Sequence, residues 1–132
     1  QQYQIIRRMS RDLWLDVEVV GMPIVREADG LAMSSRNAYL SDVERHEALS
    51  LSRALNQIEE QFRGGRHNCR DLLNAGRSII EQGTSGTIDY LQIVDAHNLQ
   101  TIEEIKTEAL CALAVVVGKT RLIDNRVLRV TV

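Results

Sequence analysis

The sequence predicts an α/β segment followed by a small α+β domain. Three observations carry this prediction: a helical apolar repeat with a β-branched run behind it, a helix-capping signature at Ser41, and three apolar strand-like runs after Gly83. We therefore expect two units, residues 1–41 and residues 42–132. The second unit should hold two main helices and a three-stranded, antiparallel sheet.

The first unit begins with a predicted helix and continues as extended chain. An apolar residue at every fourth position predicts a helix over residues 1–14, at Ile5, Met9 and Leu13. The β-branched run Val17–Val20 predicts a strand, and residues 24–25 continue as an extended segment. A helix, a strand and then a polar loop are typical of an open α/β sheet, whose ligands bind beyond the carboxyl ends of the strands.

The second unit opens with a capping box formed by Ser41 and Glu44, which predicts a helix from Asp42 to the glycine pair at 64–65. A second helix is expected over residues 69–82. Thr101 and Glu104 have the same capping spacing and indicate a further short helix.

Strands are expected over residues 88–94, 110–117 and 121–123, and residues 127–132 should form a short extended tail. The run 110–117 is apolar throughout, which predicts a strand buried on both faces. In segment 122–125 we favour a strand followed by a turn, with Asp124 and Asn125 bonded to nearby backbone.

Composition and charge limit the classes of partner. Of the 132 residues, 44% are hydrophobic and 26% are charged, as in an ordinary soluble globular chain, and the formal net charge is -2. Basic residues are spread along the chain, so we expect neither nucleic acid nor a membrane as partner. The two cysteines, Cys69 and Cys111, are expected to be reduced thiols of a cytoplasmic protein, with a single disulfide as the alternative.

The strongest indication of chemistry follows residue 25. A turn at Asp29-Gly30 and a short apolar step precede two serines, an arginine and an asparagine, at positions 34–37. Hydroxyls and backbone N–H groups can cradle phosphate oxygens, a guanidinium binds those oxygens in pairs, and Asn37 adds an amide. A solvated surface loop is the alternative that this pattern alone leaves open.

The segment Val20–Leu40 resembles the pantothenate synthetases (pantoate–β-alanine ligases), and its residues 33–36 resemble a nucleotide-binding signature of adenylate-forming nucleotidyltransferases. The resemblance continues through Leu122–Asn125. It implies that residues 1–41 are the end of a Rossmann-like nucleotide-binding domain, and that residues 42–132 form an α+β lid over the active site.

The resemblance also implies a reaction. Pantoate would react with ATP to give pantoyl-adenylate and pyrophosphate, and β-alanine would then displace AMP to give pantothenate. ATP with Mg²⁺ would be a substrate, and no prosthetic group or protein-bound metal is implied. By matching position, the resemblance implies that Ser34, Ser35 and Arg36 bind the phosphates. It implies that Val25 and Met33 line the nucleotide site. It implies that Gln2 binds pantoate through its amide.

Part of the family pattern has no match here. None of the three histidines lies in the family's His-x-Gly-His signature, and a Gly-Glu-Lys-Asp run would stand just before Gln1. We therefore expect the chain to be the C-terminal half of a longer ligase, inactive without its N-terminal half, and to form a homo-oligomer, a dimer. There are two alternatives. The chain could be a non-catalytic lid or interaction module, or it could be part of a bifunctional protein that joins the ligase to a cytidylate kinase.

Several of these residues could also have a purely structural role. Met33 can belong to the core, Gln2 can be a solvated helix residue, and Glu27 and Asp29 are interpreted as turn and surface charges rather than as a metal pair. Apolar residues of the first unit would lack cover without the rest of a parallel sheet. We therefore predict that residues 1–41 self-associate or are displaced, whereas the part after Ser41 should fold by itself.

Overall fold

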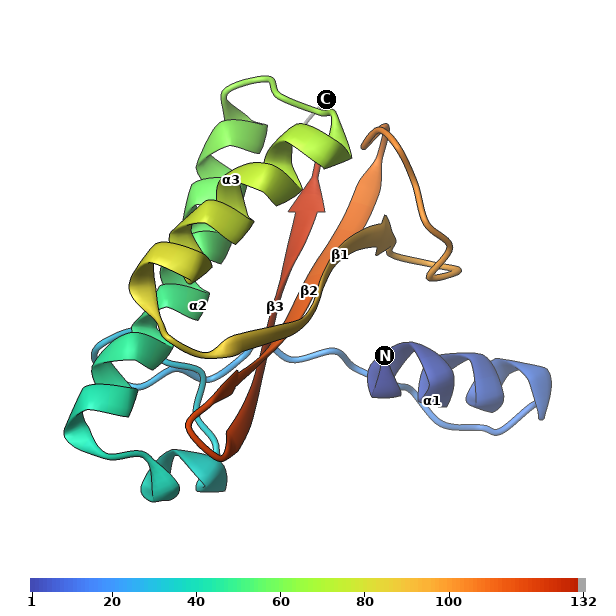
Figure 1. Ribbon diagram of the computed structural model, residues 1–132. Helices are drawn as coiled ribbons and strands as arrows, with labels where there is room; N and C mark the ends of the chain where they lie inside the picture. The colour runs from blue at the N-terminus through green and yellow to red at the C-terminus, as the bar shows by residue number, and fades with distance from the viewer. Residues whose placement is uncertain (131–132) are drawn as a thin grey trace.

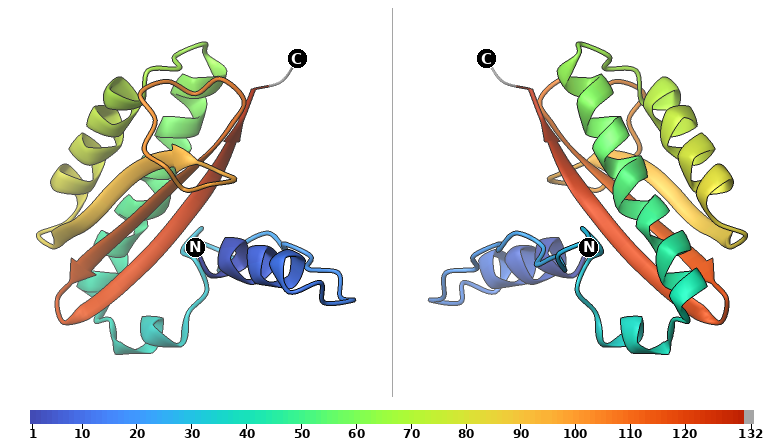
Figure 2. Two further views of the ribbon diagram at one scale, coloured as in Figure 1. Left: turned by 90° about the vertical axis from the view of Figure 1, so that its right-hand side faces the viewer. Right: turned by 90° about the vertical axis from the view of Figure 1, so that its left-hand side faces the viewer.

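Two long helices cover one face of a three-stranded sheet in the computed structural model, which describes residues 1–130 (Figure 1). A first helix, α1, lies on the opposite side of the sheet, apart from this pair (Figure 2). In chain order the elements are α1 (Gln2–Asp12), the short 3-10 helix η1 (Ser35–Tyr39), α2 (Asp42–Arg63), α3 (Cys69–Gly83), β1 (Thr87–Asp95), β2 (Glu108–Val117) and β3 (Thr120–Arg129).

The sheet is antiparallel with strand order β1-β2-β3, which confirms the predicted sheet. A tight turn joins β2 to β3 at Gly118, whose φ of 58° favours glycine. The strand β3 runs without interruption through residues 122–125, so the turn that we favoured there is wrong. Pairing with β2 keeps this segment extended, and Asp124 lies opposite Leu113.

Alternate residues of β2 differ in burial. The fully buried set faces the helices and comprises Ala109, Cys111, Leu113, Val115 and Val117. Between them, Ala114 is also fully buried, whereas Leu110, Ala112 and Val116 are only partly buried. The prediction of burial on both faces is therefore confirmed only in part, because α2 and α3 cover the same face of the sheet and leave the other one more open (Figure 2).

Both covering helices begin where the sequence predicted, α2 behind its predicted capping box and α3 at Cys69. At the start of α2, the Ser41 hydroxyl accepts from the Glu44 N–H (3.2 Å) and the Glu44 carboxylate accepts from the Ser41 N–H (2.8 Å). Asn68 caps α3 in a similar way, accepting from the Asp71 N–H at 3.1 Å. The apolar faces of both helices meet the sheet through fully buried residues, among them Leu55, Ile58, Leu72, Ile80 and Leu113.

Three local predictions are wrong or incomplete. Val17–Val20 is extended chain and not a strand, because it pairs with no other strand in residues 1–130. The short helix at Thr101–Glu104 is absent; these two residues instead form isolated bridges with Val94 and Asn68. In the expected tail, residues 127–129 belong to β3, and residues 131–132 lie outside the part of the chain that the structure describes.

The first twenty-five residues carry much of the exposed apolar surface. Trp14 is 93% exposed, Met22 80% and Ile5 55%. A hydrogen bond from Gln4 Nε2 to the carbonyl of Ala96 (2.5 Å) links α1 to the loop after β1. Self-association of this segment remains a prediction. Among the helices of residues 1–130, none has the length and apolar character needed to cross a membrane.

Candidate functional site

A small hairpin over residues 25–33 presents the serine–arginine turn. The N–H of Met33 donates to the carbonyl of Val25 (2.9 Å), and the N–H of Glu27 donates to the carbonyl of Leu31 (2.8 Å). At its tip the carboxylate of Asp29 accepts from the Leu31 N–H at 3.2 Å. Leu31 is only 3% exposed and belongs to the core, so it anchors the hairpin against the helices and sheet of residues 42–130.

The residues after this hairpin form the start of η1 and not an irregular loop. The hydroxyl oxygen of Ser34 accepts from the Arg36 N–H (3.2 Å) and so caps the helix. The proton of that hydroxyl is still available to donate. Ser34, Ser35 and Arg36 are all exposed. The three residues therefore offer their polar groups to solvent from one short turn.

Arg36 lies at the junction with the sheet. Its Nη1 donates to the carbonyl of Arg121 in β3 at 3.2 Å. Arg121 itself donates to Asp89 (2.7 Å) and lies over the ring of Tyr90 at 5.8 Å from its centroid. A guanidinium has five N–H donors, so this single contact leaves most of the Arg36 donors able to bind an anion.

Val25 and Met33 are neighbours across the hairpin and are 64% and 61% exposed. The alternative that Met33 belongs to the core is therefore wrong. Two exposed apolar residues therefore lie next to Ser34 at the end of the hairpin.

Asn37 faces inward, unlike its neighbours, and is 8% exposed. Its Nδ2 donates to the Glu27 carboxylate (2.8 Å) and to the carbonyl of Ala32 (3.0 Å). The expectation that its amide belongs to the phosphate-binding set is therefore wrong, because both amide N–H groups are used inside the protein.

Glu27 and Asp29 share one cation. Arg45 of α2 donates to Glu27 (2.6 Å) and to Asp29 (2.7 Å). The hydrogen bond from Arg45, followed by that from Asn37, lowers the pKa of Glu27; the backbone N–H of Leu31 is the main cause of the lowered pKa of Asp29. Both carboxylates are engaged in the hairpin, and residues 1–130 contain no cluster of three or more ligand-type side chains for a metal.

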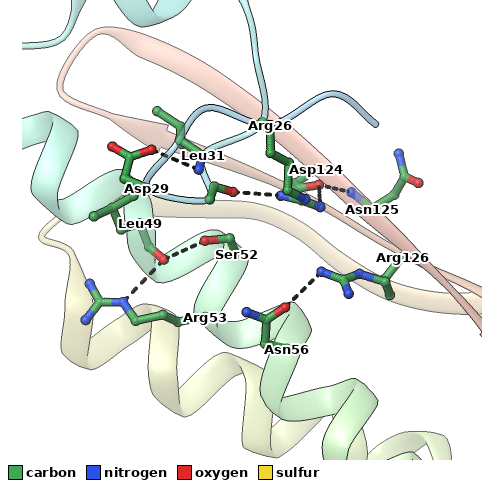
Figure 3. Close-up of polar contacts among 12 residues, drawn as sticks. Arg26, Asp29, Leu31, Leu49, Ser52, Arg53, Asn56, Asp124, Asn125 and Arg126 are labelled. Carbon is green, nitrogen blue, oxygen red and sulfur yellow. Dashed lines mark hydrogen bonds and ion pairs between the residues drawn. The ribbon is translucent and has the colours of Figure 1, made fainter. Parts of the chain in front are cut away.

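A second ion pair connects the hairpin to β3, and no sequence pattern indicated it. Arg26 donates from Nη1 and Nη2 to the two oxygens of Asp124 at 2.7 and 2.9 Å (Figure 3). Its Nη1 also donates to the carbonyl of Gly30 at 3.0 Å. The Asp124 side chain is 2% exposed, so a charged carboxylate is buried and paired here.

Beside this pair is a cavity of about 280 Å³ between the hairpin and α2, lined by Arg26, Asp29, Gly30, His46, Leu49, Ser52, Arg53, Asn56 and Arg126. Arg126 donates to Asn56 at 2.8 Å (Figure 3) and also pairs with Glu59. Arg26 and Arg126 already have acidic partners, and Arg53 donates to the carbonyl of Leu49 at 3.3 Å, so we assign the cavity no ligand.

Gln2 is the one predicted site residue that the structure does not bring to this turn. It is exposed in the first turn of α1, and both figures of the whole chain show α1 apart from η1 (Figures 1 and 2). Val25, Met33 and residues 34–36 are therefore gathered in one place, and Gln2 is separate from them.

Comparison with known sequences finds similarity to one family along almost the whole chain. The family model described as pantoate-beta-alanine ligase matches residues 1–127. A pantothenate synthetase of Trichlorobacter lovleyi is 50% identical over 128 residues, which are 97% of this chain and 45% of that protein. A pantothenate synthetase of Heliobacterium modesticaldum is 52% identical over 130 residues, 98% of this chain and 46% of that protein. The chain thus spans just under half the length of these curated relatives.

Solved structures agree on the fold. The pantothenate synthetase of Thermus thermophilus superposes with a TM-score of 0.88 at 41% identity, covering 95% of this chain and 45% of that one. A pantoate-beta-alanine ligase of Francisella tularensis, in complex with beta-gamma ATP and beta-alanine, has a TM-score of 0.59 at 24% identity, covering 95% and 39%.

Proposed function

We propose that this chain, which belongs to the pantoate–β-alanine ligase family, supplies the nucleotide phosphate-binding turn and the C-terminal lid of an ATP-dependent ligase. The observation that carries the proposal is the exposed group of Ser34, Ser35 and Arg36 at the end of the 25–33 hairpin. The exposed pair Val25 and Met33 lies beside it.

The proposed reaction activates a carboxylate and then forms an amide. The pantoate carboxylate attacks the α-phosphorus of ATP, and pyrophosphate leaves. The amine of β-alanine attacks the acyl carbon of pantoyl-adenylate, the bond to AMP breaks and the amine releases a proton, giving pantothenate and AMP. Negative charge grows on the departing phosphates, so preorganised donors lower the barrier more than proton transfer would.

In this scheme Arg36 donates in pairs to the departing phosphates, while Ser34 and Ser35 donate from their hydroxyls. Mg²⁺ would arrive with the ATP phosphates. Val25 and Met33 would line the nucleotide site, and Gln2 would hydrogen-bond pantoate. The Francisella ligase, with its bound beta-gamma ATP and beta-alanine, supports ATP and β-alanine as the substrates. We expect the enzyme to act in the cytoplasm.

Residues 1–41 would close the nucleotide-binding domain and residues 42–132 would form the lid. The family's His-x-Gly-His signature has no counterpart in the 132 residues. We therefore propose that the chain has no ligase activity by itself.

The test measures AMP formation with ATP, pantoate and β-alanine, for the full-length enzyme that contains this chain and for the chain alone. We expect AMP formation by the full-length enzyme to require both pantoate and β-alanine, and the chain alone to be inactive. A full-length enzyme without pantoate-dependent AMP formation would overturn the proposal.

A further inference from the structure

We propose that Asn37 is a positioning residue which holds the Ser34–Arg36 turn in the geometry that binds nucleotide phosphates. This inference rests on the proposed function. Asn37 is only 8% exposed and its Nδ2 is bonded inside the protein, so its part is to set the position of the exposed residues beside it.

Asn37 connects the turn to the hairpin at two places. Its Nδ2 donates to the Glu27 carboxylate at 2.8 Å and to the carbonyl of Ala32 at 3.0 Å. Its backbone belongs to the turn itself, because its N–H donates to the Ser34 carbonyl (3.1 Å) and its carbonyl accepts from Leu40 (3.2 Å). A shift of this one residue would therefore move Ser34 and the turn together.

Glu27 accepts the stronger of the two hydrogen bonds from Asn37 and is itself held in place by α2. A carboxylate acceptor makes a stronger hydrogen bond than a neutral oxygen. Arg45 holds that carboxylate from α2 at 2.6 Å and also binds Asp29 at 2.7 Å. The hairpin, the first turns of α2 and the serine–arginine turn are thus joined through a short series of charge-assisted bonds, with Asn37 at its end.

The chemistry of position 37 is specific for N–H donors. In residues 1–130 the Oδ1 atom of Asn37 has no hydrogen-bond donor, whereas both hydrogens of its Nδ2 are used. Aspartate has the same shape but no donor, and it would place a second carboxylate against Glu27. Asn37→Asp therefore removes the positioning contact without changing the volume of the side chain.

The test compares steady-state kinetics of the full-length enzyme with and without Asn37→Asp. We expect kcat/KM for ATP to fall about 10- to 100-fold, with a higher KM for ATP and an unchanged KM for pantoate. Asn74→Asp, the same change at an exposed position of α3, is the control and should leave both KM values unchanged.

In the double variant Asn37→Asp with Glu27→Gln, the new amide at position 27 can donate to the new carboxylate at position 37. This restores the hydrogen bond between the two positions with donor and acceptor exchanged, and should recover part of the lost kcat/KM for ATP. A residue that only maintains the fold would lower kcat through loss of folded enzyme, with both KM values unchanged. That pattern, or ATP kinetics equal to wild type in Asn37→Asp, would overturn the inference.

Amide exchange of the chain alone separates this inference from the proposed function. Asn37→Asp should speed exchange in Ser35–Tyr39 and leave exchange in α3 unchanged. If the wild-type enzyme forms no pantoate-dependent AMP, the proposed function fails, and the exchange rates still decide the positioning role. Faster exchange in the turn supports that role, and unchanged exchange contradicts it.

Discussion

Arg26 and Asp124 form a two-pronged ion pair between residues 98 positions apart in the chain, with N–O distances of 2.7 and 2.9 Å. The side chain of Asp124 is 2% exposed and that of Arg26 is 23% exposed. This contact and the burial of Leu31 fasten the hairpin, and with it the Ser34–Arg36 turn, to the sheet and helices of residues 42–130.

The unequal burial of the two partners predicts unequal costs of removing them. Arg26→Met leaves a buried carboxylate without its cation and should lower the free energy of unfolding by about 3–5 kcal/mol. Asp124→Asn leaves a guanidinium that still bonds the Gly30 carbonyl and reaches water, so about 1–2 kcal/mol is expected. Urea unfolding of both variants measures the difference; equal losses would show that burial of Asp124 is not the deciding factor.

The same contacts predict how far the chain can be shortened. A chain that begins at Ser41 loses Leu31 from the core and Arg26 from Asp124, so it should unfold at least about 3 kcal/mol more easily. A chain that begins at Pro23 loses mainly exposed residues and should stay within about 1 kcal/mol of the whole chain. Urea midpoints of the three chains provide the comparison. If the chain from Ser41 is as stable as the others, the hairpin does not support the fold.

Both cysteines are free and buried, as expected for reduced thiols, and they should resist labelling. Burial raises the pKa of Cys111 to about 12, so the reactive thiolate is absent at neutral pH. Because the folded pKa is the higher one, stability from this group is complete below the unfolded pKa of about 8.5 and declines as pH rises toward 12. Labelling with iodoacetamide at about pH 8 should therefore follow global unfolding and accelerate with urea. Rapid labelling in native buffer would contradict this.

The hairpin should lose stability in acid through Glu27 and Asp29. The pKa of each is lowered in the folded chain, so their contribution is present above the unfolded values of about 4 and is lost as pH falls through the lowered ones. Arg45→Gln removes a cause of both shifts. We expect the melting temperature of this variant to depend less on pH, between about 5 and 2, than that of wild type. Parallel pH profiles would contradict the prediction.

The features that sequence analysis predicted well are local ones. Ser41 and Glu44 lie on one turn and cap α2 as expected, and the residues Ser34–Arg36 are contiguous, so their donors needed no tertiary information. The apolar runs of residues 88–94 and 110–117 correctly predicted two strands, because the chain itself supplies both the neighbouring strands with which they pair and the helices against which they pack.

The features that it missed depend on distant partners. Among 18 acidic residues, nothing local marks Asp124 as the partner of Arg26. Val17–Val20 has the composition of a strand, yet pairing needs a neighbouring strand, and residues 1–130 provide none for it. The inward orientation of Asn37 depends on Glu27 and Arg45, which come from the hairpin and from α2.

The most direct test of the central claim, that the Ser34–Arg36 turn binds the phosphates of ATP, is the kinetics of Arg36→Ala in the full-length enzyme. Loss of a charge-assisted bond of about 1.5–3 kcal/mol predicts that kcat/KM for ATP falls about 10- to 100-fold. Arg36→Lys should recover only part of it, because an ammonium lacks the planar fork of donors. An Arg36→Ala enzyme with the ATP kinetics of wild type would contradict the account.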